Sequence, residues 1–364
     1  MSNTRATDAG RGLRVLGTSC QGMADAAFRV RLELPGRGLT AHGIELELLP
    51  LFSKEATRRF REAGALAKAR TLAFSRRHLK RELEAAGNAS TVVVQRGVDL
   101  APQLTLERAA AHGRRLIYDV DDAIWLSGPR TGGHRLSSLK GAARRVRWLS
   151  ERAEHTIAGN EILAEHLAPY GPVTVVPSLV DPVDYGLREH EQGEEVTLGW
   201  IGSPTTAPYL GGVAGALERF GQVSERPVRL LLLGGSAPPL EGVRVEERAW
   251  CPAAERQALA EIDIGLMPLP DTPWTRGKCA YKALQYMAAG IPAVVDDVGI
   301  SARAVGGAGY AVTGEGHWLE SLEALAADAG LRAKLGAAGR RRVEADFSPR
   351  RWLPTIAAII RGES

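Results

Sequence analysis

A lysine at the start of a short predicted helix is a candidate for binding an anion. Lys278 lies within Arg276 to Asp297, a segment that predicts a glycine turn, a helix from about Cys279 to Ala289 and an apolar strand. The first backbone N–H groups of a helix lack internal partners and form the positive end of its dipole. A cation at that end is unfavourable unless an anion arrives from outside. The segment therefore predicts a phosphate site.

Acidic residues form a second candidate group. Asp119, Asp121 and Asp122 fall within four positions at the end of the apolar run Leu116 to Val120. Carboxylates this close repel one another unless they are hydrogen-bonded or face a ligand. We expect Asp121 and Asp122 to belong to a site and Asp119 to be a buried structural acid. The pattern also suits a divalent cation, but the acids and the phosphate segment lie in different halves of the chain, so we assign no metal ligand.

Alternating strands and helices must position both groups. Strands are expected at Leu13 to Leu16, Ile44 to Leu51, Thr91 to Gln95 and Leu116 to Val120, with helices at Ala24 to Gly38, Arg58 to Ala86 and Leu100 to His112. Continuous apolar strands between helices predict a parallel sheet covered on both faces. Ligands of such sheets bind at the carboxyl ends of the strands, so the segments after Leu16, Val94 and Val120 should line one crevice.

The second half repeats this pattern after the proline-rich stretch Pro177 to Pro182. Strands are expected at Val196 to Ile201, Val228 to Leu233 and Ile264 to Met267, with helices at Tyr209 to Phe220 and Ala253 to Ile262. The predicted fold class is therefore α/β, with two doubly wound Rossmann-like domains facing across a cleft. We place the first domain at residues 1–182, the second at 183–345 and a C-terminal helix at 346–364.

Composition excludes several classes of protein. The 364 residues are 45% hydrophobic and 24% charged, as in soluble globular proteins. No apolar run approaches the roughly 20 residues that span a bilayer, and the N-terminus has no apolar core typical of a signal peptide. A cytoplasmic location is therefore expected. The three cysteines have no paired spacing, which argues against a disulfide framework or a zinc site.

The charge balance does not predict a nucleic-acid partner. Forty-six basic residues are interleaved with 42 acidic ones, giving a net charge of +4. Basic clusters occur at Arg76 to Arg81, Arg144 to Arg147 and Arg340 to Arg342, without the aromatic interleaving of a nucleic-acid surface. Solvated helix faces explain these clusters, although the first two would also help an acidic acceptor or a membrane surface approach. Peripheral membrane contact thus stays open, as does the oligomeric state.

Three segments resemble the retaining glycosyltransferases of the GT-B fold, glycosyltransferase family 4. Gln285-Tyr-Met-Ala-Ala-Gly-Ile-Pro-Ala-Val-Val resembles the family segment E-A-M-A-x-G-x-P-V-V, and the apolar strand beginning at Asp263 resembles the one before it. Val175-Val-Pro-Ser-Leu-Val-Asp resembles the family linker V-I-P-N-G-V-D. The resemblance implies a second domain that binds a nucleotide sugar, a first domain that binds the acceptor, and a last helix that crosses back to the first domain.

The family's two glutamates, which have seven residues between them, fall here on Gly277 and Gln285. Gln285 retains hydrogen-bonding capacity for ribose hydroxyls, whereas Gly277 has no side chain to offer. Lys278 and Lys282 stand one helical turn apart and would instead hold the diphosphate, together with the N–H groups of Lys278, Cys279 and Ala280. A solvated surface position is an equally good interpretation of Lys282.

Other residues are assigned by position in the resemblance. Gly202, Ser203, Thr205 and Thr206 follow the first strand of the second domain and would contact the diphosphate, although an ordinary helix cap would use the same hydroxyls. Asp121 falls where relatives have a histidine near the donor sugar. Candidate acceptor contacts are Gly22, Met23, Arg29 and His134, with His134 also explained as a surface loop residue.

The implied reaction transfers a sugar from a nucleoside diphosphate to an acceptor hydroxyl with retention of anomeric configuration. Lys278 and the helix start would stabilise the leaving diphosphate, and Asp121 and Asp122 would act near the sugar. No cofactor or metal is expected beyond the nucleotide-sugar substrate. Two alternatives stay open: a nucleotide-sugar epimerase of the same fold, and a catalytically impaired partner subunit that binds the donor.

Overall fold

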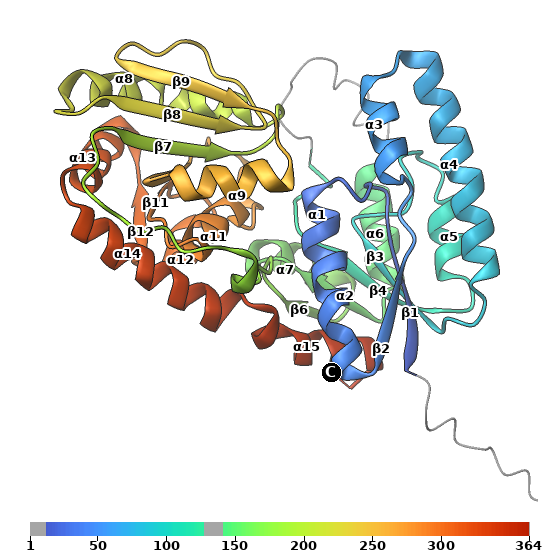
Figure 1. Ribbon diagram of the computed structural model, residues 1–364. Helices are drawn as coiled ribbons and strands as arrows, with labels where there is room; N and C mark the ends of the chain where they lie inside the picture. Colours follow the sequence, from blue (N-terminus) through green and yellow to red (C-terminus); the bar gives the residue numbers. More distant parts are fainter. Residues whose placement is uncertain (1–11, 127–140, 364) are drawn as a thin grey trace, which may run out of the picture.

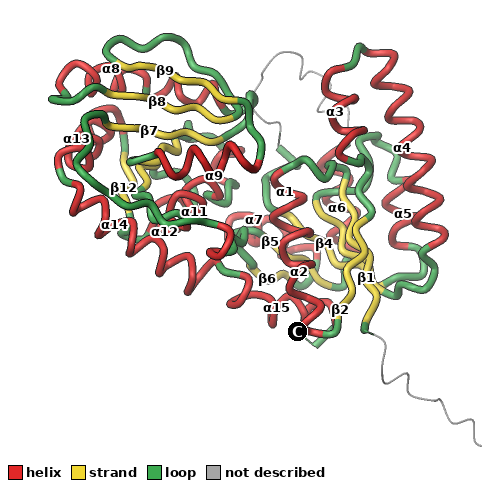
Figure 2. The backbone as a smooth tube through the Cα atoms, in the orientation of Figure 1, coloured by secondary structure: helices red, strands yellow, loops and turns green. Residues whose placement is uncertain are grey.

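The computed structural model describes residues 12–126 and 141–363, which form two α/β domains, each around a six-stranded parallel sheet (Figures 1 and 2). The first sheet has the order β2 (Ile44–Leu48), β1 (Leu13–Ser19), β3 (Thr91–Gln95), β4 (Arg115–Val120), β5 (His155–Ala158) and β6 (Val173–Val175). The second has the order β12 (Gly309–Val312), β11 (Ala293–Asp296), β10 (Ile264–Met267), β7 (Val196–Ile201), β8 (Val228–Leu233) and β9 (Val243–Arg248). These orders confirm the predicted fold class of two doubly wound domains.

Each sheet reverses its winding direction once. The chain passes from β1 outward to β2 and then returns to β3 on the other side, and it does the same from β7 to β10 in the second sheet. Such a switch point leaves a crevice at the carboxyl ends of the two strands, where ligands bind in this architecture. The fold therefore places one candidate crevice beside β1 and β3 and another beside β7 and β10.

Helices cover both faces of the first sheet. One face packs against α4 (Ala65–Ala85), α5 (Thr105–Ala111), α6 (Ala142–Arg152) and α7 (Glu161–Leu167). The other packs against α1 (Ala26–Phe28) and α2 (Leu34–Leu39), which a π-helical turn joins into one continuous helix, and against α15 (Pro349–Arg361). Because both faces are covered, all five residues of β3 are buried, as its apolar run predicts.

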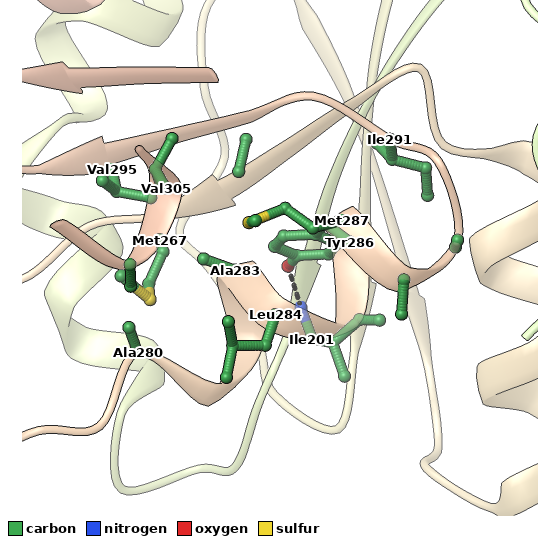
Figure 3. Packing of buried hydrophobic residues seen from close by; sticks show 14 of the residues in the cluster. Ile201, Met267, Ala280, Ala283, Leu284, Tyr286, Met287, Ile291, Val295 and Val305 are labelled. Carbon is green, nitrogen blue, oxygen red and sulfur yellow. Dashed lines mark hydrogen bonds between the residues drawn. The ribbon is translucent and has the colours of Figure 1, made fainter. Parts of the chain in front are cut away.

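The second sheet is covered in the same way. α9 (Pro252–Glu261), α11 (Tyr281–Ala288) and α12 (Ser301–Val305) lie on one face. α8 (Ala214–Val223) and α13 (Gly314–Ala327) lie on the other, while α14 (Ala329–Arg342) packs along α11. Tyr286 fixes α11 against the strands, because its hydroxyl accepts a hydrogen bond of 3.0 Å from the Ile201 N–H (Figure 3). α11 is thereby held at the switch point between β7 and β10.

The last helix connects the two domains. α15 leaves the second domain and packs beneath the first, beside α2 (Figure 1). Ile356 and Ile360 share an apolar cluster with Phe28 and Leu32, and Arg115 Nη2 donates 2.8 Å to the Ile359 carbonyl. The two domains are therefore joined at the linker and again at the C-terminal helix.

Several element boundaries differ from those expected. The long basic helix is two helices, α3 (Lys54–Glu62) and α4, separated at Ala63 and Gly64. The helix expected from Cys279 begins at Tyr281, because Ala280 has a left-handed φ of +52°. A four-residue helix, α10 (Pro273–Arg276), precedes it. Strands β5, β6, β9 and β12 were not predicted, because each is short or carries few apolar residues.

Candidate functional site

The predicted acids lie at the carboxyl end of the first sheet and are held by an arginine. Arg96 directly follows β3, and its Nε and Nη2 donate to the two carboxylate oxygens of Asp121 at 2.5 and 2.8 Å. Nη2 also donates to Asp122 at 2.7 Å, and Gln95 Nε2 donates to Asp121 at 2.9 Å. Both carboxylates are more than nine-tenths buried. The charge of Arg96 therefore offsets the repulsion between the Asp121 and Asp122 carboxylates that the sequence pattern implied.

The backbone at Arg96 is strained to make this contact. Its φ of +60° lies in the left-handed region, which is uncommon for a residue with a side chain. Such conformations persist only where the surroundings enforce them, and they concentrate at functional sites. Burial alone would raise the pKa of Asp121, but the charge and hydrogen bonds of Arg96 hold that pKa below its ordinary value. Asp121 is therefore a carboxylate at neutral pH.

Asp119 has a separate, structural role. Arg31 Nη2 donates 2.6 Å to its carboxylate, and both side chains are almost fully buried. Arg31 Nη1 donates to the carbonyls of Val176 and Pro177 at 2.8 Å each. The pair thus ties the first sheet to the start of the interdomain linker, which agrees with the expectation that Asp119 is a buried structural acid.

Lys278 reaches across from the second domain to the acids of the first. Its Nζ lies 2.9 Å from Asp122 Oδ1 and 5.1 Å from the centre of the Trp274 ring. Its backbone N–H donates to the Thr275 carbonyl at 3.0 Å. That N–H is therefore already occupied, contrary to the expectation that it would face a diphosphate. The contribution of Lys278 is its ammonium group.

An asparagine fixes the turn that carries Lys278. Asn160 caps α7 of the first domain, and its Nδ2 donates to the carbonyls of Gly277 and Lys278 at 3.0 and 3.2 Å. A Cβ on Gly277 would lie 2.7 Å from Ala123 Cβ, so no side chain fits there without displacing the first domain. Gly277, at the position where the resemblance expected a glutamate, therefore allows the close contact between the two domains.

Lys282 lies in the same crevice, as the second residue of α11. Its Nζ lies 5.1 Å above the Trp200 ring and 3.5 Å from Thr206 Oγ1. Burial, together with the charge of Lys278, lowers the pKa of Lys282 to about 7, although Asp122 acts in the opposite direction. Lys282 is thus only partly protonated near neutral pH, and a bound anion would favour its charged form.

The loop after β7 supplies hydroxyl groups beside Lys282. Ser203 Oγ and Thr205 Oγ1 lie 2.8 Å apart and are exposed, and Thr206 Oγ1 donates to the Ser203 carbonyl. A Cβ on Gly202 would lie 2.2 Å from the Trp200 ring, so glycine is required for the loop to turn over the tryptophan. The hydroxyls have the local contacts of a turn, and that of Thr206 also contacts Lys282 of α11.

Gln285 belongs to a neighbouring polar group. Its Nε2 donates to Glu255 Oε1 at 3.0 Å and to the Tyr185 hydroxyl at 3.3 Å. The other oxygen of Glu255 accepts 2.6 Å from Trp250 Nε1, and the Arg29 guanidinium lies 4.3 Å above the Trp250 ring. Arg29 comes from the first domain, so this group also spans the two domains.

Of the remaining predicted residues, Gly22 and Met23 lie apart from these contacts. Gly22 donates its N–H to Asp25 at 2.8 Å, and Met23 packs against the apolar cluster that contains α15. His134 lies outside the described residues. Cys279 is buried, with its thiol donating to the Asp121 carbonyl at 3.2 Å; burial raises its pKa to about 12, so the thiol stays protonated. Cys279 therefore holds the domain contact rather than acting as a nucleophile.

Sequence reasoning did not single out several residues of the site. Arg96 lies in a segment expected to line the crevice, but nothing in its type distinguishes it from surface arginines. Two others follow strands that were not predicted: Asn160 comes after β5 and Trp250 after β9. Glu255 lies in the first turn of α9, and only the fold shows which residues it contacts. The left-handed backbone of Arg96, directly after the buried strand β3, marks it as a site residue, but a backbone conformation cannot be read from the sequence.

The assembled site has two cations and several hydroxyls on one side and two carboxylates on the other. Lys278, in the turn before α11, and Lys282, in its first turn, both lie near Asp122, so an anion entering between them would meet two ammonium groups and the start of α11. Within the described ranges, no cluster of three His, Cys, Asp or Glu side chains has the arrangement of a metal site. The arrangement is suited to a bound diphosphate beside a pair of fixed carboxylates.

Comparisons with known proteins identify the fold. No protein-family model and no curated protein sequence matches the chain. Among solved structures, sucrose-phosphate synthase from Thermosynechococcus elongatus aligns with 96% of this chain and 99% of its own, with a TM-score of 0.68 and 12% identity. Anabaena HepE in complex with UDP and glucose aligns with 96% and 100%, with a TM-score of 0.65 and 14% identity.

A glycosyltransferase from Rickettsia africae aligns with 97% of this chain and 100% of its own, with a TM-score of 0.64 and 10% identity. Each alignment covers both domains of this chain, and the identities are low enough that the likeness is one of architecture. The GT-B glycosyltransferases to which the chain is similar share its two doubly wound domains. The protein has the GT-B fold.

Proposed function

We propose that the protein is a glycosyltransferase that moves a sugar from a nucleoside-diphosphate donor to an acceptor hydroxyl with retention of anomeric configuration. The observation that carries this proposal is the meeting of Lys278 and Lys282 with Asp121 and Asp122 between the domains. Solved structures of the similar HepE contain UDP and UDP-glucose, which supports the same class of donor here. A bacterial role in specialised metabolism or envelope glycan assembly and a cytoplasmic location are part of the proposal.

The second domain would hold the donor. The diphosphate would lie at the start of α11, between the two lysine ammonium groups and the hydroxyls of Ser203, Thr205 and Thr206. A pocket lined by Pro204, Gly234 and Ala249 opens at the carboxyl ends of β7, β8 and β9 and has room for the nucleoside. Gln285 of α11 and Glu255 of α9 are hydrogen-bonded to each other, and their amide and carboxylate groups are suited to ribose hydroxyls.

Catalysis would rest mainly on stabilising the leaving group. As the bond from the sugar to the diphosphate weakens, negative charge grows on the phosphate oxygens, and the lysines favour that charge-separated state over the ground state. With lysines in this position, we propose a metal-independent reaction. In front-face attack, the departing phosphate would take the proton of the acceptor hydroxyl, which requires no enzyme nucleophile.

The first domain would bind the acceptor and orient the sugar. Asp121 is ionised and fixed by Arg96, so it can accept hydrogen bonds from sugar hydroxyls without moving. Its fixed position and its lowered pKa make it a weak general acid, and this disfavours the epimerase alternative, which needs an acid and base at the sugar. Arg29, stacked on Trp250, would contact an acceptor bound by the first domain.

A donor panel tests the proposal. Purified protein is incubated with nucleoside-diphosphate sugars that vary in base and sugar, with and without candidate acceptors, and released nucleoside diphosphate is measured. We expect turnover with at least one donor, and NMR of the product should show the donor's anomeric configuration. A product with the opposite anomeric configuration would contradict the retaining mechanism. Binding without turnover would favour the impaired partner subunit, and neither binding nor turnover would contradict the proposal.

A further inference from the structure

The α3–α4 hairpin carries most of the excess positive charge of the protein. Residues 54–85 contain ten basic and four acidic residues, a net charge of +6, whereas the whole chain has a net charge of +4. The rest of the chain is therefore slightly acidic. Figure 1 shows α4 at the edge of the first domain that faces away from the second, with α3 packed beside it. The charge is thus concentrated on one projecting element.

One face of α4 points away from the protein and combines arginines with large apolar side chains. Leu66, Arg70, Phe74, Arg77 and Arg81 follow one another at intervals of three or four residues, which places them on one side of a helix. The opposite side packs on the core through Ser75, Leu79 and Leu83. We call the outward side the α4 face.

The α4 face is exposed and unusual in composition. Phe74 is 72% exposed and Leu66 is 68% exposed, and they account for two of the five large apolar side chains recorded as exposed in the described residues. Within the same described part of the chain, no carboxylate pairs with Arg70, Arg77 or Arg81, since the two nearby glutamates of α4 pair with His78 and Lys80. Arginines without counter-ions and uncovered apolar side chains together indicate an anionic, partly apolar partner.

We propose that the α4 face docks on an anionic phospholipid surface. A membrane interface accepts leucine and phenylalanine at the level of the acyl chains, while the long arginine side chains extend back to the lipid phosphates. A nucleic acid would neutralise the arginines but would leave Leu66 exposed to water. Among the described helices, none is long and apolar enough to cross a bilayer.

The position of α4 relates this surface to the cleft. α4 ends at Ala85, shortly before β3 begins at Thr91, so its C-terminal end lies at the amino edge of the first sheet. With 21 residues α4 is about 30 Å long, and its first turns therefore lie toward the carboxyl edge, where Asp121 stands. Docking of Leu66 and Phe74 would hold the carboxyl edge of the first sheet, rather than its amino edge, toward the membrane, which suits a membrane-borne acceptor if the proposed function holds.

Vesicle flotation tests the docking directly. The full-length protein is mixed with vesicles of phosphatidylcholine alone or of phosphatidylcholine with phosphatidylglycerol, and the fraction that floats is measured at low and at physiological ionic strength. We expect flotation with the anionic vesicles, weakened by salt. Each arginine near an anionic surface contributes roughly fivefold to partitioning, so changing Arg70, Arg77 and Arg81 to Gln should lower it on the order of 100-fold.

Matched variants distinguish binding through the α4 face from effects of net charge or of exposed apolar side chains elsewhere on the protein. Changing Arg219, Lys334 and Arg350 to Gln removes the same charge from other exposed positions and should leave binding close to wild type. L66S combined with F74S should reduce partitioning at least tenfold, whereas V223S, at an exposed position of the second domain, should not. Circular dichroism of each variant confirms that it is folded.

Several outcomes would overturn the proposal. These are no flotation of the wild type with anionic vesicles, equal flotation with neutral vesicles, or an unchanged partition coefficient in the α4 variants. Binding of a labelled single-stranded RNA through the same arginines, without vesicle binding, would assign the surface to nucleic acid instead. Donor binding, measured in parallel, should be the same in wild type and α4 variants, so failure of docking and failure of the proposed function are distinguishable.

Discussion

The pH dependence of nucleoside-diphosphate binding should report directly on Lys282. Its Nζ lies over the Trp200 ring, beside Thr206, and burial and Lys278 lower its pKa to about 7. The diphosphate favours the protonated lysine. Binding at alkaline pH therefore requires that Lys282 take up a proton, and affinity should fall as pH rises through this pKa.

The magnitude follows from the protonated fraction. From pH 7 to pH 9 that fraction falls from about one half to roughly one hundredth, so Kd should rise on the order of 50-fold if the bound lysine keeps its proton. The terminal phosphate is almost fully ionised across this range, since its second pKa is about 6. The ligand itself therefore adds little to the slope.

Isothermal titration calorimetry with UDP and other nucleoside diphosphates measures this dependence. K282R should bind with little change between the two pH values, because an arginine stays protonated. K282Q should bind weakly at the lower pH and should also show little dependence on pH. Affinity of the wild type that does not change with pH, or a slope that persists in K282Q, would refute the assignment of Lys282 to the anion site.

Three further predictions concern the architecture of the site. R96Q should lower the free energy of unfolding, measured in urea, by about 3–5 kcal/mol, because it leaves two buried carboxylates without their shared cation. The control R147Q, at an exposed ion pair, should change it by less than about 1 kcal/mol. Equal effects of the two variants would contradict the role of Arg96. G277A should destabilise by about 1–3 kcal/mol through its contact with Ala123, and A123G should relieve the loss in a double-mutant cycle. N160A should lower stability by about 1–3 kcal/mol, through loss of the α7 cap and of a donor to two carbonyls; an unchanged urea midpoint would remove it from the domain contact.

Much of the fold could be predicted from periodicity. β3, β7, β8 and β10 have the predicted bounds, because each is a continuous apolar run that two layers of helices bury. β9 is missed because it is an edge strand, where charged residues such as Arg244 and Glu246 face solvent and pair with one another. The break between α3 and α4 is missed because Ala63 and Gly64 are too weak a signal within a helical pattern.

The site was harder to predict than the fold. Lys278 and Asp122 were each identified from local chemistry, but their contact joins positions 156 residues apart and depends on how the domains face each other. Arg96 and Asn160 acquire their roles only through that arrangement. Gly277 appeared to be a loss of a functional side chain, whereas its contact with Ala123 shows that the position has no room for one.

The most direct test of the central claim compares donor affinity in two lysine variants. K278A removes the ammonium group that faces Asp122 at the start of α11, and K80A removes an exposed lysine that pairs with Glu84 on α4. Loss of a charge-assisted contact of about 2–3 kcal/mol should raise the Kd for the nucleoside diphosphate by roughly 30- to 150-fold in K278A, with less than a twofold change in K80A. Equal affinities of the two variants would contradict a donor diphosphate bound between Lys278 and Lys282.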